Sequence, residues 1–200
     1  HESWPIAGSY IRRVVGERWE PGFSGEPANF EEASLKMMPR PVYEKFVKGY
    51  TEKQWGVPAR GLSARLAGRF DVREDDDPRL FRKRFQGIPR DGYATLMRNM
   101  LAGIPVLLNV DYLAHRQEFE ARKLLVFTGP VDELFRFDLG RLAYRGQQRE
   151  ERYLPDVDWY QPAGQVNNPD PANGPSIRTL EWKHMLPPET AERIRGTVVT

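Results

Sequence analysis

Residues 48–56 read Lys-Gly-Tyr-Thr-Glu-Lys-Gln-Trp-Gly and form the end of a helical pattern. Apolar side chains recur at i, i+3, i+4 and i+7, the spacing of one helix face, at Tyr43, Phe46, Val47 and Tyr50. Gly49 interrupts this stripe at a cost of about 1 kcal/mol relative to alanine. A glycine there predicts the close approach of another backbone or a ligand, or else a kink. Thr51 and Trp55 lie one turn apart on an adjacent face, and Gly56 can end the helix.

Other helices are predicted in the first half of the chain. Asn29 and Glu32 have the spacing of a capping box, with asparagine in place of the usual serine or threonine. The short apolar face that follows ends before Pro39. Leu62 and Leu66 indicate another short helix. After Gly92 comes the fullest helical stripe in the chain, at Tyr93, Leu96, Met97, Met100 and Leu101.

The second half of the chain reads differently. Short apolar runs bounded by turn residues predict buried strands at 104–110 and 123–128, with a helical segment at 112–122 between them. Alternating patterns predict strands of a mixed or antiparallel sheet at 142–149, 163–168 and 177–184. Helices first and strands later indicate an α+β fold.

The predicted organisation has four parts. They are a lead-in at 1–28 with one short helix near 10–17, a helical domain at 29–103 with a loop at 70–79, a separate segment at 104–133, and an incomplete sheet domain at 134–200.

Composition describes a folded globular chain, with 40% hydrophobic and 12% aromatic residues among 200. No apolar run reaches the roughly 20 residues of a membrane-spanning helix, so no membrane span is expected. The net charge is only +2, and the basic runs carry acids beside them, which argues against a nucleic acid partner. The absence of cysteine excludes disulfides and Cys-ligated zinc and fits a cytoplasmic location.

No complete catalytic constellation stands out. The chain lacks a nucleophile elbow, a Walker glycine loop and a Gly-x-Gly-x-x-Gly motif. His1, His115 and His184 are too scattered to indicate a metal site. The acidic run at 75–77 fits either a cation site or a solvated turn before Pro78, and we predict the turn.

Aromatic residues near isolated arginines are the most informative chemistry. Phe46, Tyr50 and Trp55 precede Arg69, and Phe81 follows it. The planar guanidinium of arginine can clamp a pyrophosphate, and aromatic faces stack on nucleobases. This combination fits a nucleotide diphosphate site, although aromatic residues in a core and arginines on a surface would give the same pattern.

Six stretches in order resemble the UDP-galactopyranose mutase family. They are residues 42–56, the Arg-Phe-Asp-Val-Arg of 69–73, the Phe-Gln-Gly-Ile-Pro of 85–89 with Gly92-Tyr93, the Phe-Thr-Gly-Pro-Val-Asp of 127–132, the Leu-Ala-Tyr-Arg of 142–145, and the Arg-Thr-Leu-Glu-Trp-Lys-His of 178–184. The resemblance covers roughly residues 27–200, and the order of the stretches makes it far more specific than any single motif.

The resemblance implies a flavoenzyme with FAD that interconverts UDP-galactopyranose and UDP-galactofuranose. In this family the N5 of the reduced flavin attacks the anomeric carbon of the sugar, and the protein supplies binding, orientation and charge. The implied fold is a three-domain mutase of which this chain is the central fragment. UDP-galactose is the implied partner, and a homodimer is compatible with the resemblance.

The resemblance also assigns roles to individual residues. Arg69 and Arg178 would be loop arginines that neutralise the diphosphate. Tyr50 and Phe81 would hold the uridine, with Phe46 and Thr51 beside them. Trp55 would border the sugar, and Asn168 and Arg145 would be further polar contacts in the pocket. The flavin would lie close to Thr128, Gly129 and Pro130.

Three positions depart from the family pattern. Leu80 and Ser176 replace usual tyrosines, and Asp71 replaces a proline. These changes leave open a related flavoprotein that acts on another nucleotide sugar, or a binding module without turnover. The sequence begins at His1 without an initiator methionine or a signal peptide. We expect the 200 residues alone to hold no FAD and to be inactive, because the resemblance implies further flavin-binding segments.

Overall fold

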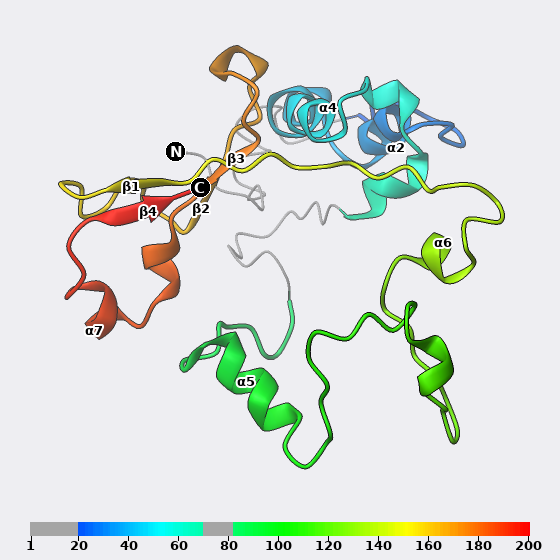
Figure 1. Cartoon of the computed structure of the whole chain (residues 1–200). Coiled ribbons are helices and arrows are strands. Elements are labelled where there is room, and N and C mark those ends of the chain that lie inside the picture. Colours follow the sequence, from blue (N-terminus) through cyan, green and yellow to red (C-terminus); the bar gives the residue numbers. More distant parts are fainter. Residues whose placement is uncertain (1–19, 70–81) are drawn as a thin grey trace. The chain divides into compact units, whose positions relative to one another are not determined.

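The computed structural model describes residues 20–69 and 82–200 (Figure 1). The short helix expected near 10–17 and the loop at 70–79 lie outside these ranges. The chain divides into two compact units. The first contains the described residues up to Gly87 together with Arg149–Thr200, and the second is Ile88–Gln148.

Helix α2, Phe30–Met37, begins with the predicted cap. The Asn29 side chain accepts a hydrogen bond from the Glu32 N–H at 3.1 Å, which confirms the prediction. The Glu32 carboxylate reaches back to the Ala28 N–H at 2.8 Å, one residue before the position of a standard capping box. Both bonds satisfy donors that lack partners at a helix start. Phe30 and Leu35 on this helix are buried.

The predicted helix up to Gly56 is present but is not uniform. It consists of α3 (Arg40–Val42), the π-helix η1 (Tyr43–Lys48) and α4 (Gly49–Trp55). Hydrogen bonds from i to i+5 widen the middle segment, so the apolar stripe is split between two environments. Tyr43 and Val47 are buried, whereas Phe46 and Tyr50 are only partly buried. Gly56 ends α4 in the left-handed region with φ 65°, as predicted.

A hydrophobic core joins these helices to two 3₁₀ segments, η2 (Ala59–Gly61) and η3 (Ala64–Arg69). These segments replace the single short helix predicted around Leu62 and Leu66. The core contains Phe30, Ala33, Leu35, Met38, Val42, Tyr43, Val47, Ala59 and Ala67. Burial of these side chains holds α2, η1 and η3 together, and η3 carries Arg69 at its end.

Two small antiparallel sheets complete the first unit. β1 (Arg152–Leu154) pairs with β4 (Thr197–Val199), and β2 (Gln165–Asn167) pairs with β3 (Arg178–Leu180). The last two confirm shortened forms of the strands predicted at 163–168 and 177–184. The remaining elements are the 3₁₀ segments η5 (Pro171–Asn173) and η6 (Trp182–Met185) and helix α7 (Pro188–Ala191). The predicted α+β composition is confirmed.

A buried carboxylate supports the chain just after β3. Glu181 is fully buried and accepts hydrogen bonds from the N–H groups of Tyr160 and Gln161, both at 2.9 Å, and from the Thr197 hydroxyl at 2.7 Å. Burial alone would raise the pKa of Glu181, but these hydrogen bonds and nearby His184 outweigh it and lower the pKa. The carboxylate therefore ties two segments, at 160–161 and at Thr197, to the end of the strand that begins with Arg178.

The second unit contains α5 (Gly92–Met100), the 3₁₀ turn η4 (Arg116–Glu118) and α6 (Val131–Leu134). Helix α5 confirms the helix that was predicted from the fullest apolar stripe of the sequence. Only the η4 turn forms within the helix predicted at 112–122. None of the described helices is long and apolar enough to cross a membrane.

The strands predicted at 104–110, 123–128 and 142–149 are wrong. These segments are extended or irregular, and Leu107 and Leu124 are 68% and 78% exposed. A strand forms only when its backbone groups pair with a neighbouring strand. The described residues offer these segments no such pairing.

Candidate functional site

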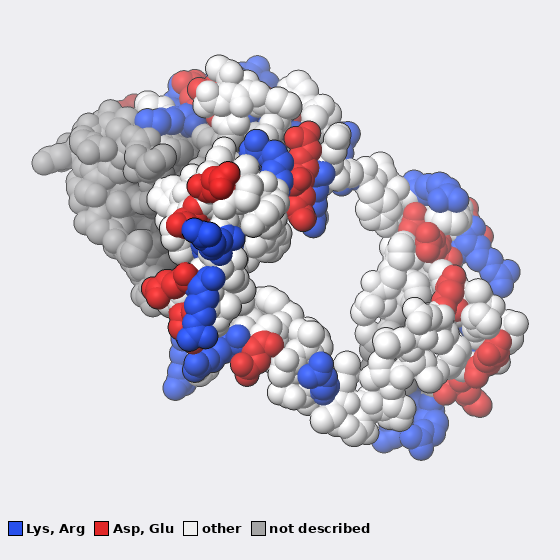
Figure 2. Space-filling model, turned by 60° about the vertical axis from the view of Figure 1, so that its left-hand side comes forward, with Lys and Arg blue, Asp and Glu red and all other residues white. Residues whose placement is uncertain are grey.

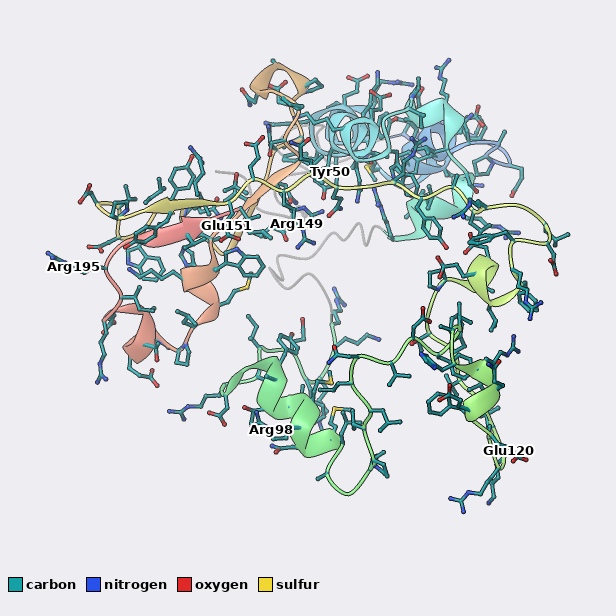
Figure 3. All side chains as sticks on the ribbon, viewed as in Figure 1. Tyr50, Arg98, Glu120, Arg149, Glu151 and Arg195 are labelled. Carbon is teal, nitrogen blue, oxygen red and sulfur yellow. The ribbon has the colours of Figure 1, made fainter. Side chains whose placement is uncertain are left out.

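Tyr50 on α4 and Arg178 at the start of β3 are in direct contact, although 128 positions separate them. The Arg178 Nη2 group donates a hydrogen bond to the Tyr50 hydroxyl, and the guanidinium carbon lies 5.7 Å from the centroid of the Tyr50 ring. Nη1 donates to the Gln165 side chain on the paired strand at 3.4 Å. Figure 3 shows Tyr50 between α4 and β3.

Arg69 reaches the same face of α4 from the end of η3. Its Nη2 and Nη1 groups donate to the Thr51 hydroxyl and the Gln54 amide oxygen, both at 3.3 Å. Burial lowers the pKa of Arg69; the Tyr50 hydroxyl opposes this shift, and the positive charge of Arg178 adds to it. The two arginines thus contact neighbouring residues of α4, Thr51 and Tyr50.

This cluster concentrates positive charge. In the part of the chain that the structure describes, no carboxylate forms a salt bridge with Arg178. The positive charge of Arg178 is therefore available to an anion. Guanidinium forks match the geometry of phosphate oxygens, so the arrangement suits a diphosphate.

Two buried donors at the site are left without partners. The indole Nε1 of Trp55, at the end of α4, has no hydrogen-bond acceptor among residues 20–69 and 82–200, and neither does Nε of Arg178. An unsatisfied buried donor costs about 1–3 kcal/mol. A ligand with oxygen acceptors would relieve this cost, so both groups fit a binding role.

Asn168 follows β2 and stabilises the loop that leads to β3. Its side-chain amide donates to the carbonyls of Asn173 and Ser176 at 3.1 and 3.0 Å. The amide nitrogen is thus already occupied within the loop, and the side-chain oxygen is the group left for a ligand.

The other predicted site residues have different local surroundings. Phe46 is partly buried against the hydrophobic core, with Lys45 Nζ 5.5 Å from its ring centroid. Phe81 lies outside the described residues. The remaining predictions belong to the second unit, where all are exposed: Thr128, Gly129, Pro130 and Arg145.

The structure adds residues that the sequence interpretation missed. Gln54 contacts Arg69, Gln165 contacts Arg178, and Lys53 donates to three loop carbonyls. Helical spacing could have identified two of them, since Lys53 and Gln54 lie three positions after Tyr50 and Thr51. No motif marks Gln165.

Other features of the described residues do not compete with this site. A cavity of about 320 Å³ on the helical part is lined by acidic and basic side chains and contains none of the predicted residues. Basic and acidic side chains are also interspersed on the face drawn in Figure 2. Within the same ranges, no group of three or more His, Asp or Glu residues could hold a metal ion.

Comparison with known proteins gives a consistent family. The sequence profile described as GLF, UDP-galactopyranose mutase, matches residues 45–200. A dTDP-fucopyranose mutase from Escherichia coli is 32% identical over 91% of this chain and 49% of its own length. A probable UDP-galactopyranose mutase from Klebsiella pneumoniae is 34% identical over 90% of this chain and 46% of its own length.

A UDP-galactopyranose mutase from Mycoplasma genitalium matches a shorter part, with 29% identity over 56% of this chain and 33% of its own length. The chain spans about half the length of the first two relatives. The family match includes Tyr50, Thr51, Arg69 and Arg178, the residues that meet at the site. The chain therefore belongs to the UDP-galactopyranose mutase family.

Proposed function

We propose that the complete protein interconverts the pyranose and furanose forms of a nucleotide-linked sugar, with UDP-galactose as the first candidate. The observation that carries this proposal is the meeting of Arg69 and Arg178 around Tyr50 and Thr51. Two arginines with hydroxyl groups between them match the charge and the oxygen-rich surface of a diphosphate.

Each residue then has a specific task. Arg69 and Arg178 bind the diphosphate and neutralise the charge that develops when the bond to the sugar breaks. Tyr50, Thr51, Phe46 and Phe81 line the nucleotide side. Trp55 borders the sugar, where its unpartnered indole N–H can donate to a sugar hydroxyl. Asn168 and Arg145 supply further polar contacts.

The family resemblance implies FAD as the cofactor. Reduced flavin would supply the nucleophile for the anomeric carbon and is regenerated, because the reaction is an isomerisation. Thr128, Gly129 and Pro130 would hold it. The exposure of these residues leaves them accessible, and the buried donor of Trp55 suits a site completed by other groups. We expect the 200 residues alone to bind no FAD.

A second nucleotide sugar deserves equal testing. The relative named dTDP-fucopyranose mutase is as similar to this chain as the probable UDP-galactopyranose mutase. Leu80 and Ser176 stand at positions where we expect tyrosines in UDP-galactopyranose mutases. Loss of these hydroxyls would remove hydrogen bonds to the nucleotide. The alternative substrate is therefore a thymidine nucleotide with a 6-deoxy sugar, as in the name of the first relative.

The test uses the full-length protein, reduced with dithionite. Incubation with UDP-galactopyranose and, separately, with dTDP-fucopyranose should yield a furanose product from one of them, seen by chromatography and NMR. Product from UDP-galactose alone supports the first proposal, and product from the thymidine sugar alone replaces it. Bound nucleotide sugar without any product would instead indicate a binding module without turnover.

We further propose that the complete protein is cytoplasmic and forms a homodimer. A cytoplasmic location follows from the cytoplasmic supply of nucleotide sugars. Sedimentation of the full-length protein would test the homodimer.

A further inference from the structure

Lys53 uses all of its hydrogen-bonding capacity on one loop. Its ammonium group donates to the backbone carbonyls of Asn168, Asp170 and Ser176 at 3.0, 2.7 and 3.2 Å. An ammonium group has three N–H donors and no acceptor. Lys53 therefore has no donor left for a phosphate while this arrangement persists.

The loop from Asn168 to Ser176 is itself tightly closed. The Asn168 side-chain amide bonds to carbonyls at 173 and 176, and its backbone N–H donates to the Ile177 carbonyl at 2.9 Å. The Asp170 carboxylate accepts a hydrogen bond from the Ala172 N–H at 2.8 Å. These internal hydrogen bonds make the loop rigid, so contacts to its carbonyls position the whole loop.

Helix α4 touches this loop at a second point. An added Cβ on Gly49 would lie 2.2 Å from the Pro169 carbonyl oxygen and 2.9 Å from a ring carbon of Pro171. Only glycine allows this approach, which confirms the close contact predicted from Gly49. Lys53 lies one turn further along α4, so the helix holds the loop by one steric and one polar contact.

We propose that Lys53 is a positioning residue that sets Arg178 against Tyr50 by clamping the loop at 168–176. Ser176, which Lys53 holds, lies two residues before Arg178, and Tyr50 lies three residues before Lys53. The clamp thus fixes both partners of the Tyr50–Arg178 contact at short range. The consequence for ligand binding rests on the proposed function, since it takes the ligand of Arg178 to be a nucleotide diphosphate.

Partial burial of Lys53 disfavours the charged form that the clamp uses. It lowers the pKa of Lys53, and the nearby Asp170 carboxylate offsets part of this effect. The three carbonyl oxygens accept hydrogen bonds from the ammonium group and so replace the water that it loses on burial. A methionine of similar length would fill the space and provide no donor.

The test is a double-mutant cycle in the full-length protein, with UDP as the probe and its Kd measured by calorimetry. Lys53→Met and Arg178→Ala should each weaken UDP binding about tenfold. In the Arg178→Ala background, Lys53→Met should have almost no further effect, because Lys53 acts through Arg178. Lys48→Met, an exposed lysine on the preceding turn, serves as the matched control and should change nothing.

A further tenfold loss in the Arg178→Ala background would overturn the proposal and make Lys53 a direct ligand. If Lys53→Met does not fold, Gly49→Ala replaces it, because its Cβ displaces the same loop, and it should show the same non-additivity.

Hydrogen exchange without ligand tests the Lys53 clamp independently of the proposed function. Lys53→Met should speed exchange of the amides of Asn168 and Asn173, which bond within the loop, at least about fivefold without ligand, and Lys48→Met should not. If neither UDP nor dTDP binds the unmodified protein, the proposed function fails, and this exchange alone decides the clamp. Unchanged exchange in Lys53→Met would overturn it.

Discussion

The hydrogen bond from the Arg178 guanidinium to the Tyr50 hydroxyl joins the two halves of the first unit. Tyr50 belongs to the helical half and Arg178 to the sheet half. The contact places a positive charge over an aromatic ring, with the ring centroid 5.7 Å from the guanidinium carbon. Both side chains are only partly buried, so we expect changes at either residue to affect ligand binding more than folding.

Arg178→Lys should weaken UDP binding by about tenfold, or about 1.4 kcal/mol. Lysine keeps the charge but cannot bond to Tyr50, Gln165 and a phosphate through one planar fork. Calorimetric titration of the full-length protein measures the effect. Arg195→Lys, at an exposed arginine, is the control. Equal affinities for Arg178→Lys and the unmodified protein would remove Arg178 from the site.

Tyr50→Phe should reduce UDP affinity about fivefold, with little change in the thermal unfolding midpoint. The ring remains, but Arg178 loses the hydroxyl acceptor that orients it. A hydrogen bond to a charged group contributes about 1.5–3 kcal/mol. Tyr93→Phe removes an exposed hydroxyl on α5 and provides the comparison. A large fall in the unfolding midpoint with normal affinity would show that Tyr50 is only structural.

Glu181→Gln should lower the thermal unfolding midpoint at pH 7 and flatten its dependence on acid pH. The pKa of Glu181 is lowered in the folded state, so its stabilising contribution is present above the unfolded value near 4.3. That contribution is lost as the pH falls through the lower folded pKa. The unmodified protein should lose stability below about pH 5, whereas the variant lacks the contribution of the Glu181 carboxylate at every pH.

The control for this pH dependence is Glu192→Gln, which changes an exposed glutamate. Its unfolding midpoint should follow that of the unmodified protein at both pH 7 and pH 4. If Glu181→Gln showed the same acid response as the unmodified protein, another carboxylate would be responsible.

Gly56→Ala should destabilise the end of α4 by about 1 kcal/mol, because alanine is disfavoured in the left-handed region. No atom lies within 4 Å of an added Cβ, so backbone strain is the whole effect. Gly61 has equally open space without a positive φ, and Gly61→Ala should be close to neutral. Hydrogen exchange of the last turn of α4 measures both; equal effects would contradict the strain argument.

Most of the correct predictions came from short sequence patterns. The Asn29 cap, the close approach at Gly49 and the end at Gly56 depend on neighbouring residues and on general backbone preferences. The proximity of Tyr50 and Arg178 depends on how two distant segments pack, and only the family resemblance indicated it. Lys53 was missed because its partners are backbone carbonyls at least 115 positions away, which leave no side-chain pattern.

The incorrect strands have a related cause. Apolar runs at 104–110 and 123–128 have strand-like composition, but composition does not supply a pairing partner. The pairs β2–β3 and β1–β4 form because each strand has a complementary segment in the same unit.

The π-helical segment at 43–48 also sets the rotational phase of everything that follows it on the helix. An α-helix turns by about 100° per residue, so removing one residue from this segment would rotate α4 by roughly that angle. Tyr50, Thr51 and Lys53 would then face away from Arg178, Arg69 and the loop at 168–176. The length of this one segment is therefore under constraint, even where its side chains are free to vary.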